Sequence, residues 1–164
     1  MVYGAILEKG ESYYIYLRKV FDAIENVQTQ YNWLITNFVG YPRSPSIDAL
    51  LSQKYCWLSG RALTSMVHQE DFQWIWAVLS GFRQEISLDE ALKHPLPCAD
   101  GYEGFWKNPL TIQHPLAEVE IVPWDSSLTL IYSRRKDIVA SFRKFFPLSE
   151  DMASYNQQFT SSQP

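Results

Sequence analysis

Residues 71–83 read DFQWIWAVLSGFR, and this stretch decides the fold class that the sequence predicts. If the stretch is a strand, Trp74 and Trp76 share one face, whereas Ile75 and Ala77 belong to the other. Both faces are then apolar, which is typical of a central strand covered on both sides. A buried helix also fits such a short apolar run, but the β-branched and aromatic residues and the glycine near the end favour a strand.

Apolar residues at strand or helix spacing extend the prediction to the rest of the chain. Strands and helices alternate in the first half, and the last two strands pair as a hairpin. The pattern predicts an α+β fold: a single domain over residues 1–156, built on one mixed or antiparallel sheet packed by several short helices, and a frayed tail at 157–164. The expected strands are residues 3–7, 31–39, 55–58, 71–83, 118–122 and 128–132, and the expected helices are residues 11–25, 46–52, 61–69, 88–94, 137–146 and 149–156.

Local signals support several of these elements. Ser44 followed by Pro45 has the order of a helix cap and a first helical residue. Ser87 and Glu90 have the Ser-x-x-Glu spacing of a capping box, in which the two side chains accept hydrogen bonds from backbone N–H groups reciprocally. Residues 95–115 combine prolines and glycines with large aromatic residues, so we expect a long irregular loop that packs onto the domain.

Charge and composition exclude several classes of protein. The net charge of −4 lacks the basic surface with which proteins bind phosphate backbones, so nucleic acid is not an expected partner. The two cysteines are too few for a disulfide framework, and the first residues do not form a signal peptide. No apolar stretch approaches the roughly 20 residues that span a bilayer. We therefore expect a cytoplasmic protein that is not inserted in a membrane.

The residues that could carry chemistry do not fall into a recognised spacing. The glycines never form a GxGxxG or GxxxxGK[ST] phosphate loop. His94, Cys98, Asp100 and His114 offer metal-binding atoms, but without CxxC or HExxH spacing a packed thiol and a helix-terminal histidine are the simpler interpretation. We expect no cofactor, no metal ion and no catalytic residue.

One pair of carboxylates shares a predicted strand face. Glu118 and Glu120 are two residues apart, so both project from the side opposite Val119 and Ile121. The simplest interpretation is the solvent face of an amphipathic strand. The alternative that bears on function is an acidic patch that binds a partner.

Residues 118–132 form the predicted hairpin, and residues 137–146 form the helix that follows it. With this hairpin and helix, the C-terminal third resembles the ends of small uncharacterised bacterial proteins, and it is similar to the endings of immunity proteins that neutralise polymorphic toxins. The stretch EDFQWIWA at 70–77 is compatible with a central strand of such proteins. The resemblance implies a bacterial, cytosolic, non-enzymatic α+β protein, with toxin binding as one role. The segments that carry it are VEI at 119–121, WDSSLTLIYS at 124–133, KDIV at 136–139 and FFP at 145–147.

These observations lead to two main hypotheses. The first is a protein-interaction module, most concretely an immunity protein that binds a toxin through Glu118 and Glu120, with Trp106 and Tyr102 as aromatic anchors. The second is a small-molecule-binding protein or an enzyme, with a pocket under the 95–115 loop. The polar and stacking groups of that pocket would be His94, Cys98 and Trp106. A third hypothesis is an intracellular regulator.

Overall fold

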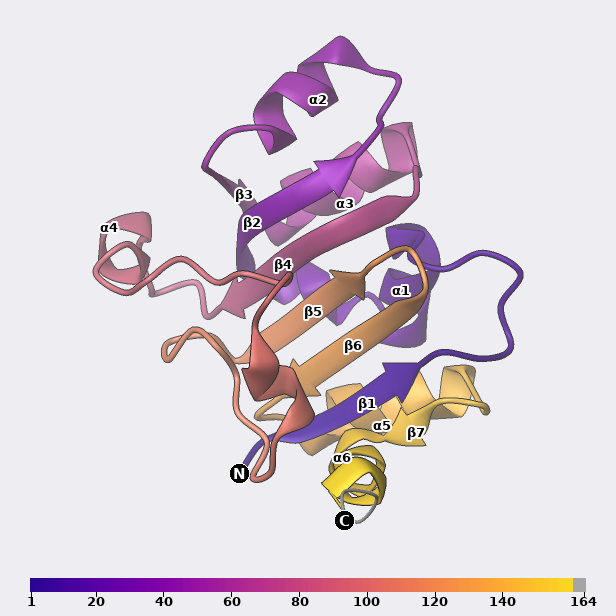
Figure 1. Ribbon diagram of the computed structural model, residues 1–164. Coiled ribbons are helices and arrows are strands. Elements are labelled where there is room, and N and C mark those ends of the chain that lie inside the picture. The colour runs from indigo at the N-terminus through magenta and orange to yellow at the C-terminus, as the bar shows by residue number, and fades with distance from the viewer. Residues whose placement is uncertain (161–164) are drawn as a thin grey trace.

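The computed structural model describes residues 1–160, which form a seven-stranded antiparallel sheet with helices and a long connection packed on it (Figure 1). The α+β class is confirmed, and every strand pair in the sheet is antiparallel. The sheet order is β3-β2-β4-β5-β6-β1-β7. The strands are β1 (Tyr3–Leu7), β2 (Asn32–Gly40), β3 (Tyr55–Ser59), β4 (Trp74–Phe82), β5 (Val119–Trp124), β6 (Leu128–Ser133) and β7 (Glu150–Asp151). The helices are α1 (Leu17–Ala23), α2 (Pro45–Leu51), α3 (Gly60–Gln69), α4 (Leu88–Ala91), α5 (Lys136–Phe145) and α6 (Met152–Thr160), with 3₁₀ turns η1 (Val27–Gln30) and η2 (Glu103–Trp106).

The predicted central strand is confirmed, and the helical alternative for this stretch is wrong. β4 lies between β2 and β5, where Leu79 pairs with Ile35 on one side and with Ile121 on the other. Consecutive residues of β4 are buried on opposite faces: Leu79 joins one apolar core and Val78 the other. Apolar residues of both parities are therefore explained by burial on both faces of the sheet.

The two tryptophans of β4 do not share a face. The register between β2 and β4 shifts between Thr36 and Val39 and again before Gly40, which is the signature of a β-bulge. Trp74 therefore packs in one core, whereas Trp76 contacts Trp124 in the other, with ring centroids 4.8 Å apart. Simple alternation fails here because a bulge changes which face the next side chain meets.

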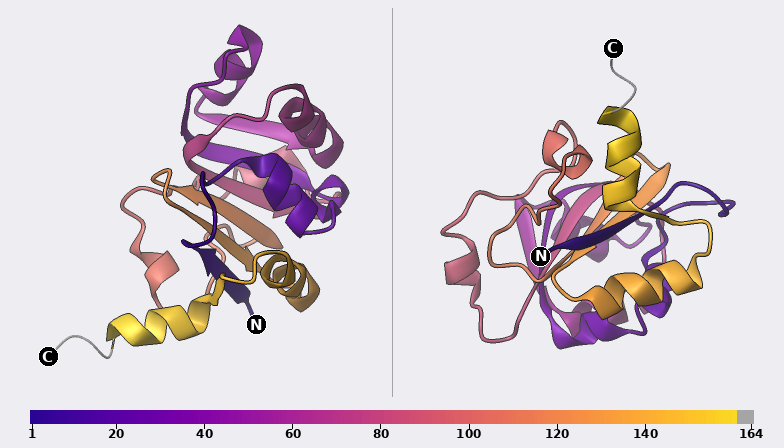
Figure 2. Two further views of the ribbon diagram at one scale, coloured as in Figure 1. Left: turned by 90° about the vertical axis from the view of Figure 1, so that its right-hand side faces the viewer. Right: turned by 90° about the horizontal axis from the view of Figure 1, so that it is seen from below.

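Each face of the sheet is covered by a different kind of structure (Figure 2). Helices α1, α3 and α5 lie on one face, and α6 lies on the other together with the connection between β4 and β5. We call residues 93–117 of this connection the cover segment. Ala99, Phe105 and Ile112 of the cover segment are buried in the second core. The prediction of an irregular loop that packs onto the domain is confirmed.

The helix predicted over residues 11–25 is shorter than expected. Ile15 has a left-handed backbone with φ of 67°, and its carbonyl accepts a hydrogen bond from the Trp74 N–H at 3.0 Å. The chain is thus tied to the start of β4 before α1 begins at Leu17. Tyr13, which the apolar stripe of the sequence places inside, is instead 73% exposed.

Both predicted helix caps are confirmed. The Ser44 hydroxyl accepts from the Ile47 N–H, with Pro45 in the first turn of α2. At α4, the Ser87 hydroxyl accepts from the Glu90 N–H at 3.2 Å, and the Glu90 carboxylate accepts from the Ser87 N–H at 2.8 Å. The reciprocal bonds satisfy two backbone donors that the helix cannot satisfy itself.

The end of the described chain differs from the expected tail. Helix α6 continues to Thr160, so residues 157–160 are helical rather than frayed. The remaining residues of the expected tail, 161–164, lie outside the described residues. Within residues 1–160, no helix is both long enough and apolar enough to cross a membrane.

Candidate functional site

Glu120 occupies an unusual position for a carboxylate, in the middle of the sheet. It pairs with Ser80 on β4 and with Tyr132 on β6, and its side chain is fully buried beneath the cover segment. Its carboxylate accepts a hydrogen bond from the backbone N–H of Gln113, with N–O distances of 3.2 and 3.4 Å. Burial raises the pKa of Glu120 to about 8, because the ionised form loses its hydration.

The neighbours of Glu120 along this row are polar and buried as well. The Ser80 hydroxyl has no hydrogen-bond partner among the described residues. The Tyr132 hydroxyl donates to the carbonyl of Phe105 at 3.1 Å. Burial raises the pKa of Tyr132 well above its ordinary value, and the neighbouring Glu120 raises it further. Three adjacent strands thus place Ser, Glu and Tyr side chains in one row under the cover segment.

The expectation that Glu118 and Glu120 share an exposed face is wrong. Glu118 precedes β5, at the end of the sheet where Tyr31 precedes β2 and Arg83 follows β4. There it accepts from the Tyr31 hydroxyl at 2.7 Å and from the Arg83 guanidinium at 3.0 and 2.8 Å. The hydrogen bonds of Tyr31 and Arg83 lower the pKa of Glu118 against the opposing effect of burial. One carboxylate is paired and the other is enclosed, so the two form no acidic patch.

The aromatic residues expected beside that patch belong to the packing of the cover segment. Tyr102 is partly buried and meets the ring of Phe105 at 4.7 Å, edge to face. Trp106 is also partly buried and meets the ring of Trp124 at 5.1 Å. Such aromatic pairs contribute about 0.5–1.5 kcal/mol each beyond area burial. The contact of Trp106 holds the cover segment against β5, whereas that of Tyr102 lies within the cover segment.

The residues of the predicted pocket pack against different neighbours in the fold. The His94 ring lies 5.3 Å from that of His114, whereas Trp106 packs elsewhere, on Trp124. Cys98 is exposed, and its backbone N–H donates to the Gln113 side chain at 2.7 Å. The cavities described below are lined by other parts of the chain.

His114 is a structural residue of the cover segment. Its Nδ1 accepts from the Leu116 N–H at 3.2 Å, so Nε2 carries the proton and donates to the Ala91 carbonyl at 3.0 Å. Burial lowers the pKa of His114, and the charge of His94 lowers it further. In the part of the chain that the structure describes, no three His, Cys, Asp or Glu side chains come close enough to hold a metal ion.

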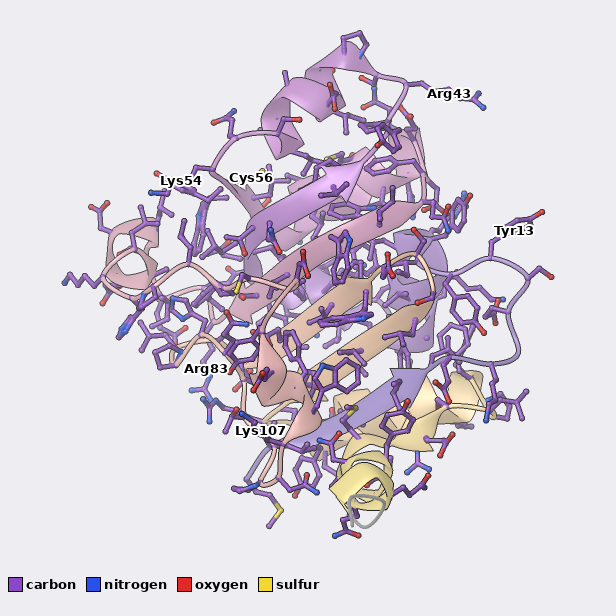
Figure 3. The ribbon with its side chains drawn as sticks, viewed as in Figure 1. Tyr13, Arg43, Lys54, Cys56, Arg83 and Lys107 are labelled. Carbon is purple, nitrogen blue, oxygen red and sulfur yellow. The ribbon has the colours of Figure 1, made fainter. Side chains whose placement is uncertain are left out.

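Exposed aromatic and apolar side chains gather on a different side of the molecule. Tyr13 and Tyr41 are 73% and 81% exposed, and Phe145 and Leu148 are 45% and 60% exposed. Tyr13 and Tyr41 lie in the connections that follow β1 and β2, Phe145 is the last residue of α5, and Leu148 lies in the connection after α5. In Figure 3 the Tyr13 side chain extends from the connection after β1, on the side of the molecule where Arg43 also lies. We call the side chains of Tyr13, Tyr16, Tyr41, Phe145 and Leu148 the tyrosine surface.

A row of cavities runs along the tyrosine surface. Cavities of about 20 and 260 Å³ share Leu7, Glu11 and Phe146 in their walls. Tyr16 lines the first of these and also a larger cavity of about 370 Å³. Because each cavity shares at least one residue with the next, the three cavities lie next to one another along the tyrosine surface.

The largest of these cavities has polar groups in its wall. Glu70 accepts hydrogen bonds from the backbone N–H groups of Arg43 and Ser44 and so fixes the connection that carries Tyr41. Asp71 accepts from the Arg18 N–H at 3.4 Å, and partial burial raises its pKa. The wall is therefore held by hydrogen bonds that join the connection before β4 to the connection after β2 and to helix α1.

Sequence reasoning missed this surface. The periodicity of residues 11–25 assigns Tyr13 to a buried stripe, and Tyr41 is part of a turn beside Pro42. A large aromatic residue in a Pro-rich turn is the signal that could have pointed to Tyr41. No protein-family model, curated protein or solved structure matches this chain in comparisons with known proteins.

Proposed function

We propose that this protein is a non-enzymatic protein-interaction module that binds its partner through the tyrosine surface. The observation that carries the proposal is the exposure of large apolar side chains on one side of the molecule. Of the seven exposed large apolar residues among those described, four belong to the tyrosine surface: Tyr13, Tyr41, Phe145 and Leu148. Contiguous exposed apolar patches of this kind mark interaction sites in soluble proteins.

The type of residue supports the same proposal. Tyrosine and arginine are enriched among the residues that dominate binding energy at protein interfaces. Tyr13 and Tyr41 are exposed tyrosines of this kind, and Arg43 lines the same cavity as Tyr41. A tyrosine ring buries a large area with few rotatable bonds, so it loses little conformational entropy when a partner covers it.

A toxin is the partner class that the resemblance to immunity proteins implies. The net charge of −4 supports a basic partner, since opposite charges steer two proteins together. We therefore propose toxin neutralisation by occlusion as the specific role. The tyrosine surface replaces Glu118 and Glu120 as the contact, because Glu120 is enclosed and Glu118 is paired with Arg83.

Co-expression tests the proposal. The chain is expressed with the product of the neighbouring gene, and complex formation and rescue of growth are measured. In the Tyr13→Ala and Tyr41→Ala double variant we expect at least a tenfold weaker complex, because interface tyrosines contribute about 2 kcal/mol or more when they are central.

The matched control is Leu116→Ala, which removes an exposed apolar side chain outside the tyrosine surface. It should leave the affinity unchanged. If the wild-type chain shows no binding and no rescue of growth, the toxin assignment is wrong. Binding that survives in the double variant would remove the tyrosine surface as the contact.

A further inference from the structure

The cover segment is joined to the sheet by side chains rather than by strand pairing. Its backbone hydrogen bonds form local turns, such as those from Tyr102 N–H to the Ala99 carbonyl and from Lys107 N–H to the Gly104 carbonyl. Gly101, with φ of +79°, lies in one of these turns. Lifting this part of the chain therefore leaves the hydrogen-bonded ladder of the sheet intact.

Four side chains of the sheet each hold one part of the cover segment. These contacts follow one another across β2, β5 and β6, and they fall at both ends and in the middle of the cover segment. The Thr36 hydroxyl donates to the Pro97 carbonyl at 2.7 Å, and the Tyr132 hydroxyl donates to the Phe105 carbonyl at 3.1 Å. Asn37 Oδ1 accepts from the Ala99 N–H at 2.8 Å, and the Glu120 carboxylate accepts from the Gln113 N–H at 3.2 Å.

Of these four contacts, that of Glu120 is the one whose charge can change near neutral pH. The titratable groups around it are Tyr132 on β6 and, in the cover segment, His114 and Tyr102. On β4, the residue next to Glu120 is Ser80, which carries no charge. None of these groups supplies a positive charge, because burial lowers the pKa of His114. If Glu120 were ionised in the closed structure, its only hydrogen-bond donors among residues 1–160 would be backbone N–H groups. These donors would not compensate for the loss of hydration by water.

The sheet and its helices enclose Glu120 on three sides. Strands β4 and β6 flank it in the plane of the sheet, and helices α1, α3 and α5 cover the opposite face (Figure 2). The cover segment lies over it without a ladder to the sheet. We propose that the cover segment is an opening element of the fold, with Glu120 as the latch that releases it on ionisation.

The pH range of the opening follows from the two states of Glu120. In the closed form its pKa is about 8, and in the open form it returns toward the ordinary value of 4.5. Below pH 4.5 both forms are protonated, so pH has no effect. Between these two values only the open form loses its proton, so the open population rises about tenfold per pH unit. Above pH 8 both forms are ionised, and the population levels off.

Hydrogen exchange read by mass spectrometry tests this device in the full chain. Protection factors, corrected for the intrinsic effect of pH on exchange, are measured from pH 5.5 to 9. In peptides from residues 98–113 of the wild type we expect protection to fall about tenfold per pH unit up to pH 8 and then to level off. In Glu120→Gln, protection of the same peptides should not depend on pH.

Two controls separate opening of the cover segment from other effects. Peptides from β2 and α3, which report global unfolding, should stay more strongly protected than residues 98–113 at every pH. Equal protection in all these peptides would mean that the cover segment opens only when the whole fold unfolds, and would overturn the proposal. Glu118→Gln removes a neighbouring carboxylate that is paired with Arg83 and should keep the pH dependence of the wild type. If Glu120→Gln does not fold, pH-independent protection of residues 98–113 in the wild type alone rejects the latch.

Discussion

Replacing Glu120 by glutamine should make the stability of this protein less dependent on pH. Glutamine has the shape of the protonated carboxyl and retains an oxygen that accepts the Gln113 N–H. In the wild type, the unfolded chain loses the Glu120 proton above pH 4.5, whereas the folded chain keeps it until about pH 8. The folded state thus binds the extra proton, and stability falls as pH rises through this range.

The size of the effect follows from the width of the range. Each pH unit between the two pKa values changes the free energy of unfolding by about 1.4 kcal/mol. From pH 4.5 to pH 7, the advantage of Glu120→Gln over the wild type should therefore grow by about 3 kcal/mol. Comparing the same two proteins at several pH values cancels any constant difference in packing between the amide and the carboxyl.

Urea unfolding followed by tryptophan fluorescence, from pH 4.5 to pH 8.5, measures this growth. Glu118→Gln is the matched control, because its hydrogen bonds with Tyr31 and Arg83 lower the pKa of Glu118 rather than raise it. The stability that Glu118 contributes is fully present above its unfolded pKa of 4.5 and is lost only as pH falls below that value. The difference in stability between Glu118→Gln and the wild type should therefore stay nearly constant over the assay range. An advantage of Glu120→Gln that stays constant with pH would refute a neutral Glu120 in the folded protein.

Three further substitutions test the packing and the caps. Phe105→Ala should destabilise the fold by about 3–5 kcal/mol in urea unfolding, since this buried ring of the cover segment stacks on Tyr132 with centroids 5.6 Å apart. Ser87→Ala should cost about 1 kcal/mol or less in the same measurement, because it removes the capping box of the short helix α4. Gly60→Ala should lower the melting temperature more than Gly101→Ala, because an added Cβ would lie 2.0 Å from the Gln28 carbonyl oxygen. At Gly101 an added Cβ meets no atom within 4 Å, so Gly101→Ala carries only the backbone strain of its φ of +79°, about 1–2 kcal/mol. Equal losses would contradict the close approach at Gly60.

The sequence by itself determined the elements whose signals are local. The apolar run that became β4, the alternating residues of β5 and β6, and the caps at Ser44 and Ser87 each depend on near neighbours in the chain. A strand that is buried on both faces has apolar residues at nearly every position, so its own sequence shows the burial. The α+β class follows from these elements, and it was predicted for that reason.

The tertiary structure alone decided where the carboxylates and tyrosines lie. Polar and apolar residues alternate around Glu120, as they do in a strand with one solvent-exposed face. The sequence of the strand itself carries no sign that a distant segment covers that face. Residues 93–117 enclose that face and turn an expected surface group into a buried acid. The prediction that Tyr13 is buried was wrong for a related reason. The hydrogen bond between Ile15 and Trp74 prevents a helix before Leu17, and Trp74 lies outside the stretch whose periodicity predicted that helix. The candidate site therefore depends on contacts between segments far apart in the chain, and periodicity carries no information about such contacts.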